Sequence, residues 1–165
     1  MHAIEFWSTI SPSLNQEILE TAYLNEKKLY RRVVDDLAAN LRKRPKVVLE
    51  MPRQARHELF RPLLQLPNLH ILSQNLFIHW LATTQVPLMN AFLDALDIKH
   101  DGAGSVEAFP ATVEKKKLSA AVDKLYAGFE QEKVSAYLSV FDSISGAKWD
   151  DLGSLIKAFP VDPKS

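Results

Sequence analysis

Cysteine is absent from this chain of 165 residues, and glycine is scarce, with only five residues. Without a thiol there can be no disulfide, no thiolate metal site and no cysteine nucleophile. The five glycines form neither GxxxxGK[ST] nor GxGxxG after a strand, so the usual phosphate-binding loops are excluded. These absences remove several enzyme classes before any residue is assigned a role.

Full charge is missing from residues 62–93, which contain no Asp, Glu, Lys or Arg. Such a stretch must be shielded from water, lie in a membrane or meet a partner. The part between Pro67 and Pro87 is long enough to span a bilayer, but its many amide, hydroxyl and imidazole groups argue against that. We therefore expect a helix near 69–84 that neighbouring helices surround on nearly every side.

Helical periodicity dominates the rest of the chain. Leu29, Val33, Leu37 and Leu41 recur every four residues, for example, and other segments repeat the pattern. The sequence predicts an all-α fold, a compact bundle of about eight helices around the buried helix near 69–84. We expect one domain over 1–165, with the loop at 98–111 as the alternative point of division.

Local signals place several helix boundaries. Ser11-Pro12 favours a helix start, and a break is expected near Asn25. Asn68 and Thr112 are predicted N-caps. Lys46–Met51 contains the only β-like run, which we interpret as an extended connector. A last short helix is expected from about Trp149 to Phe159.

Two polar pairs stand out within the uncharged stretch. His70 and Gln74 are four residues apart on one face of the expected helix, and Asn75 and His79 are four apart on another. They could be hydrogen-bonded structural groups, or they could line a pocket for a small molecule. A third interpretation is an exposed apolar face that forms a homodimer.

All arginines precede Pro62, and several follow one another along a predicted helix. Arg53, His57 and Arg61 lie one turn apart, with Arg56 nearby, so this edge could bind an anion or an acidic partner. The alternative is a solvated edge on which Glu58 pairs with Arg61.

Nucleic-acid binding is a weaker hypothesis for the basic segment Arg42–Arg61, through the phosphate backbone. The helix after the turn at Leu66–Asn68 lacks Lys and Arg, which makes sequence-specific DNA binding unfavourable there.

Known catalytic and metal-binding patterns fail when they are checked residue by residue. His57-Glu58 begins an HExxH motif, but Arg61 stands where the second histidine is needed. The loop around Asp101 lacks the carboxylates of a calcium loop. No GxSxG is present. We therefore assign no catalytic residue, no metal ligand and no cofactor.

These failures favour a binding protein over an enzyme. The expectation is a soluble helical protein that binds a protein partner or self-associates, with a small-molecule site near His70 and His79 as the alternative. Net charge is zero, which gives no general attraction to nucleic acid or anionic membranes. The N-terminus resembles no secretory signal, so a cytoplasmic location is expected.

Overall fold

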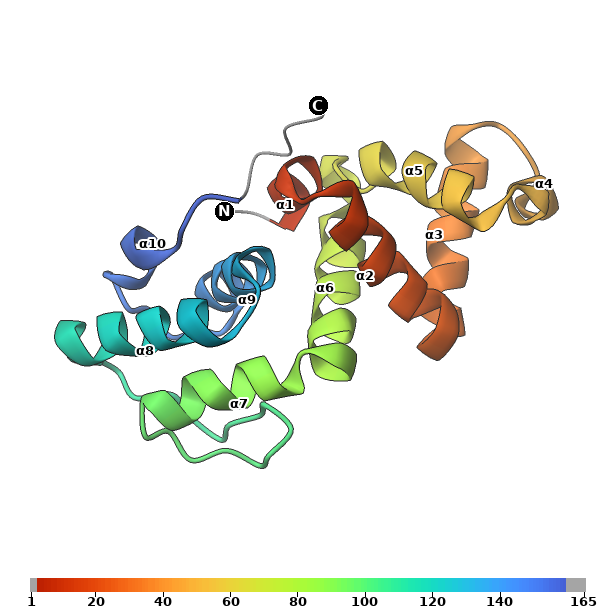
Figure 1. The fold of residues 1–165 in the computed structure, drawn as a ribbon. Helices are drawn as coiled ribbons and strands as arrows, with labels where there is room; N and C mark the ends of the chain where they lie inside the picture. Colours follow the sequence, from red (N-terminus) through yellow and green to blue (C-terminus); the bar gives the residue numbers. More distant parts are fainter. Residues whose placement is uncertain (1–2, 160–165) are drawn as a thin grey trace. The chain divides into compact units, whose positions relative to one another are not determined.

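The computed structural model describes residues 3–159 and, for side chains, residues 5–159. Over this range the chain forms ten α-helices and one short 3-10 helix, with no strand (Figure 1). The predicted all-α fold is confirmed. The described chain divides into two compact units, 3–80 and 81–159, so the division falls inside a helix. The 98–111 loop lies wholly within the second unit.

The N-terminal unit contains the first helices of the chain. They are α1 (Ala3–Thr9), α2 (Pro12–Asn25), α3 (Lys27–Asn40), α4 (Pro45–Glu50), α5 (Arg53–Leu63), the 3-10 helix η1 (Pro67–Leu69) and most of α6 (His70–Thr84). The C-terminal unit contains α7 (Val86–Ala95), α8 (Lys115–Gly128), α9 (Gln131–Ile144) and α10 (Leu152–Leu155).

The start of α2 and its separation from α3 follow the local sequence signals. Ser11 has extended backbone, and its hydroxyl oxygen accepts a hydrogen bond of 3.1 Å from the Leu14 amide. Pro12 occupies the first turn, where its missing N–H costs nothing. Glu26 has non-helical backbone angles, φ −136° and ψ 76°, and separates the end of α2 at Asn25 from the start of α3. Both predictions are confirmed.

The segment Lys46–Met51 is largely helical, so the predicted extended connector is wrong. Pro45 begins α4 with its fixed φ. Val48 is fully buried and anchors this short helix to the core of the N-terminal unit. Tertiary burial here overrides the local preference of two adjacent valines.

Three other boundary predictions also differ from the structure. Asn68 lies inside η1, so it does not cap α6. Helix α8 begins at Lys115 after Glu114, three residues beyond Thr112. The last helix covers only Leu152–Leu155.

Aromatic rings fill the core of the N-terminal unit. Phe77 of α6 packs against Phe6 and Trp7 of α1, with ring centroids 5.4 and 5.0 Å apart. Tyr30 of α3 meets Phe60 of α5 at 5.7 Å. Helix α2 contacts both α3 and α5 (Figure 1). The buried residues of α6 thus join helices that are distant in sequence.

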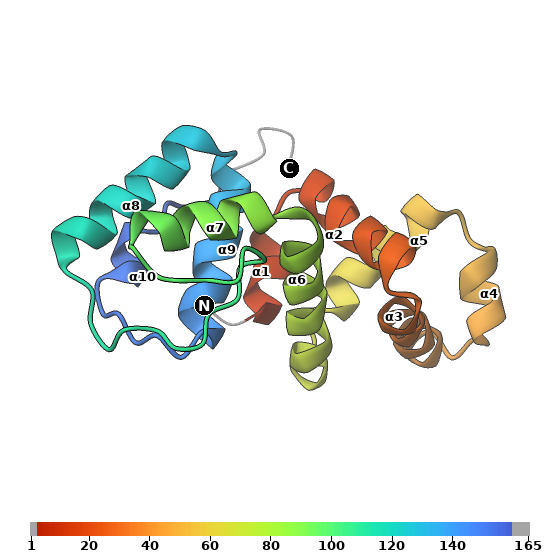
Figure 2. The same ribbon diagram turned by 90° about the horizontal axis from the view of Figure 1, so that it is seen from below.

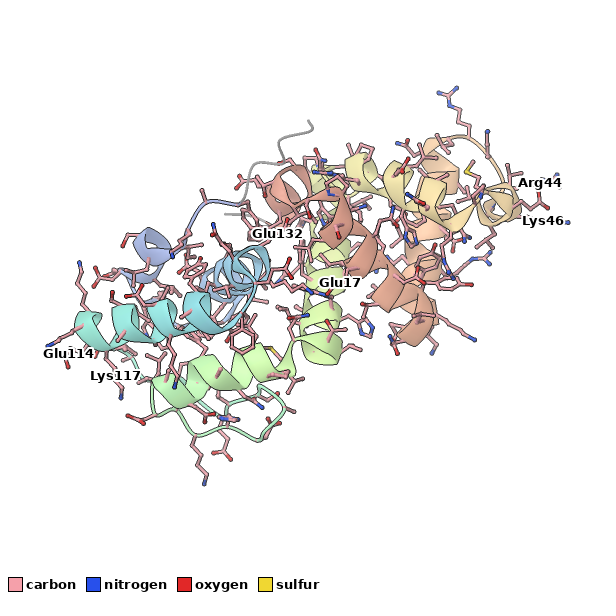
Figure 3. All side chains as sticks on the ribbon, viewed as in Figure 1. Glu17, Arg44, Lys46, Glu114, Lys117 and Glu132 are labelled. Carbon is pink, nitrogen blue, oxygen red and sulfur yellow. The ribbon has the colours of Figure 1, made fainter. Side chains whose placement is uncertain are left out.

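One side of α6 is anchored by polar contacts as well as apolar ones. The Ser73 hydroxyl donates to the Leu64 carbonyl at 2.6 Å. The Trp80 indole N–H donates at 2.9 Å to a carboxylate oxygen of Glu17, which is labelled on α2 in Figure 3. The opposite side is open, because Ile71 is 56% exposed and Ile78 is 40% exposed. The expectation that α6 would be covered on nearly every side is therefore wrong.

In the C-terminal unit, α8 contacts α7, α9 and α10 (Figure 2). Phe92 of α7 meets Phe141 of α9 at 5.3 Å, and Trp149 joins the same cluster. The Trp149 indole N–H donates to the Pro110 carbonyl at 3.0 Å, which fastens the long loop before α8. Among residues 3–159, no helix combines the length and apolarity that crossing a bilayer requires.

Candidate functional site

The open side of α6 carries a short stripe of two isoleucines and one asparagine. Successive residues of an α-helix are rotated by about 100°, so Ile71, Asn75 and Ile78 lie within an arc of about 60°. All three are exposed. No charged residue occurs anywhere in α6, so the surface that α6 presents to water contains only apolar and neutral polar groups. We call Ile71, Gln74, Asn75 and Ile78 the uncharged face.

The two predicted polar pairs do not converge on one point of this helix. Gln74 and His79 are half-buried and flank the stripe on opposite sides, whereas Asn75 lies within it. His70 is exposed at the start of the helix, where its Nδ1–H donates to the Pro67 carbonyl at 3.1 Å. By helical geometry the four residues spread over about half of the circumference of α6.

Arg53, the first residue of the predicted basic edge, is held in a paired arrangement. Its Nε lies 3.1 Å from a Glu20 carboxylate oxygen. Its guanidinium also stacks over the Tyr23 ring, 4.3 Å from the centroid. Both Arg53 and Glu20 are part-exposed at an open hollow of about 590 Å³. This hollow is lined by Gln16, Glu17, Glu20, Arg53 and Gln54.

Arg61 binds the end of a different helix. Its Nε donates to the Trp7 carbonyl at 2.8 Å, and its Nη2 donates to the Ile10 carbonyl at 2.6 Å and the Ser8 carbonyl at 3.4 Å. These carbonyls lie at the C-terminal end of α1, where a cation complements the helix dipole. The rigid, forked guanidinium of Arg61 therefore caps the C-terminal end of α1.

His57 is fully buried between α2 and α3 and holds a single tautomer. Its Nδ1–H donates to Gln16 Oε1 at 2.8 Å, and its Nε2 accepts the Tyr30 hydroxyl at 3.0 Å. Burial, helped by the positive charges of Arg56 and Arg53, lowers the His57 pKa to about 4. Burial likewise raises the pKa of Tyr30 to about 12. Both rings are neutral at pH 7, and both imidazole nitrogens are occupied.

Arg56 is also buried, beside the same network. Its Nη1 donates to the Leu49 carbonyl at 3.4 Å, and its guanidinium lies 5.8 Å from the centre of the Tyr30 ring. The four residues predicted as one edge therefore share a helix but face different partners. Sequence spacing placed them correctly on α5 and could not show these partners, because Gln16 and Tyr30 are 41 and 27 residues away from His57.

A second hollow, of about 500 Å³, lies in the loop of the C-terminal unit and is lined partly by His100 and Asp101. His100 Nε2–H donates to Asp94 Oδ1 at 2.9 Å, and the Gly102 amide donates to His100 Nδ1 at 3.1 Å. Amides of Ala103 and Ser105 donate to Asp101, which lowers the pKa of that carboxyl. The side chains of His100 and Asp101 thus hydrogen-bond to the loop itself and to Asp94 of α7.

No cluster of three or more metal-binding side chains occurs within the described part of the chain. Comparison with protein-family models, curated proteins and solved structures finds no match to this sequence.

Proposed function

We propose that this protein acts by binding another polypeptide through the uncharged face of α6. The observation that carries the proposal is the exposure of Ile71 and Ile78, one helical heptad apart, on a helix without any charged residue. Scattered exposed apolar residues are normal on protein surfaces. A solvent-facing helix side that has no charge at all is less usual than scattered apolar residues. It matches the cores of protein interfaces, in which charged residues are depleted.

Energetics support a contact at this position. Fully burying an isoleucine side chain stabilises a complex by roughly 1.5–3 kcal/mol. Because Ile71 is 56% exposed and Ile78 is 40% exposed, the two together offer a partner about as much as one such side chain, roughly 1.5–3 kcal/mol. Asn75 lies between them and presents both a donor and an acceptor, which adds directional contacts without a charge to desolvate. The basic residues of α5 offer less, because Arg53 and Arg61 are already engaged within the unit.

The test places a photo-crosslinking amino acid at Gln74, between the two isoleucines, in the full chain expressed in cells. Irradiation should give discrete adducts of higher mass. These adducts should disappear when Ile71→Asp and Ile78→Asp are combined, because two carboxylates would have to be desolvated in the interface.

Leu24→Asp is the matched control. Leu24 is 62% exposed on α2, two residues before Glu26, and does not belong to the uncharged face. This variant should keep the adducts. Absence of any adduct from the parent chain, or equal adducts from the double variant, would overturn the proposal.

A further inference from the structure

We infer that the partner on the uncharged face is a second copy of this chain, docked antiparallel about a two-fold axis near Gln74 and Asn75. This inference rests on the proposed function and names its occupant. Such an axis lies midway between Ile71 and Ile78, the two exposed isoleucines of the face. A two-fold axis at that midpoint therefore sets Ile71 of one copy against Ile78 of the other.

The spacing of the stripe fits such a helix pair. Ile71, Asn75 and Ile78 are separated by four and three residues, which is the spacing of the d, a and d positions of a heptad seam. An asparagine at such a position fixes register, since its amide can donate to and accept from the same amide of the copy.

Charge also favours a copy as the occupant. A two-fold interface brings each surface against itself, so any charged group near the axis would face its own like charge. Contact between the two copies of α6 brings no like charges together, since α6 itself contains no charged side chain. The whole chain carries no net charge, so two copies also approach without long-range repulsion.

The size of the face determines the expected strength. The 15 residues of α6 form a helix about 22 Å long and about 10 Å across, which offers a few hundred Å² per copy. Stable complexes bury about 800 Å² on each partner. The pair should therefore be weak and concentration-dependent.

Cysteine cross-linking tests the geometry directly, since the chain has no thiol of its own. Full-length Ile71→Cys and Ile78→Cys proteins are oxidised separately and as an equal mixture, and disulfide-linked dimer is followed on non-reducing gels. In the antiparallel pair, the mixture should cross-link at least tenfold faster than either protein alone. In either protein alone, the introduced cysteine would lie about 10 Å along the helix axis from the same cysteine of the second copy. That distance exceeds the usual Cα separation of about 4.4–6.8 Å in a disulfide.

Asn75→Cys, close to the axis, should cross-link to itself as fast as the mixture. Leu24→Cys is the control for random collision, since Leu24 is exposed outside the face. A mixture no faster than Leu24→Cys overturns self-pairing. Fastest cross-linking by Ile71→Cys alone overturns the antiparallel arrangement.

The photo-crosslinking experiment separates this inference from the proposed function. Adducts of twice the chain mass support the second copy. Adducts of any other mass that require Ile71 and Ile78 leave the proposed function standing and refute self-pairing. Absence of all adducts refutes both.

Discussion

His57 is a titratable ring that the fold holds in one protonation state. Gln16 and Tyr30 occupy its two nitrogens, and its side chain is fully buried. A proton added to Nε2 would displace the Tyr30 hydrogen bond and place a third positive charge beside Arg53 and Arg56. The neutral ring is therefore part of the packing between α2, α3 and α5. Protonating it costs free energy in the folded protein, whereas the unfolded chain has no such cost.

The pH dependence of stability follows from this cost. The pKa of His57 is about 4 in the folded protein against 6.5 for an ordinary histidine. Below pH 6.5 His57 becomes protonated in the unfolded chain, whereas in the folded protein it stays neutral until about pH 4. The free energy of unfolding should fall across this window as pH decreases, by about 2 kcal/mol after allowance for residual screening by water.

Urea unfolding of the parent chain and of His57→Gln at pH 7, 6, 5 and 4 measures this effect. Titration of the carboxylates is common to both proteins and cancels in their difference. The gap in stability should narrow towards pH 4, because the glutamine does not titrate. A gap that stays constant over the whole range would mean that His57 titrates normally in the folded protein.

At the scale of elements, α1 shows how a short helix is held in place. Its apolar residues Phe6 and Trp7 are fully buried, and its C-terminal carbonyls receive the Arg61 guanidinium. A helix of seven residues is too short to be stable alone, so these tertiary contacts maintain it. The side chain suggested by sequence as an anion ligand is, in the structure, a cap for a neighbouring helix.

Removing this cap should destabilise the N-terminal unit. Arg61→Ala leaves part-buried carbonyls without their charged donor, which we expect to cost about 2–3 kcal/mol. Arg61→Lys should lose about half of that, because an ammonium cannot reproduce the fork. Arg32→Ala, at an exposed position of α3, is the control and should change stability by less than about 0.5 kcal/mol. Urea unfolding provides the measurement, and equal effects of the two alanine variants would contradict the assigned role.

On the scale of the whole molecule, the described chain consists of two units with separate aromatic cores. Phe60 is fully buried in the first and Phe92 in the second. Stability can differ between such units, because each opens with the free energy of its own contacts. The arrangement also means that α6 carries residues of both units along a single helix.

Hydrogen exchange can separate the two cores. Phe60→Ala and Phe92→Ala should each cost about 3–5 kcal/mol in the unit that contains the lost ring. We expect Phe60→Ala to accelerate amide exchange mainly in residues 3–80, and Phe92→Ala mainly in residues 86–159, measured by mass spectrometry of peptides. Uniform acceleration by both variants along the chain would show that the units unfold as one.

Sequence alone determined the helices whose signals are local. The four-residue apolar repeat from Leu29 to Leu41 belongs to one helix and its end, and the start at Ser11-Pro12 and the break after Asn25 rest on single residues. Such features depend on backbone sterics, hydrogen bonds within one turn, and side-chain periodicity. They are therefore readable without knowledge of the neighbours.

Tertiary structure alone decided what those helices face. Composition could not separate a buried α6 from a half-exposed one, because cores and interfaces are both depleted of charge. Val48 becomes helical through its burial, against its local preference. The partners of His57 and Arg61 lie 27 to 54 residues away in sequence, and only folding brings them within hydrogen-bond distance. Short-range signals thus determine elements, whereas long-range contacts determine surfaces and sites.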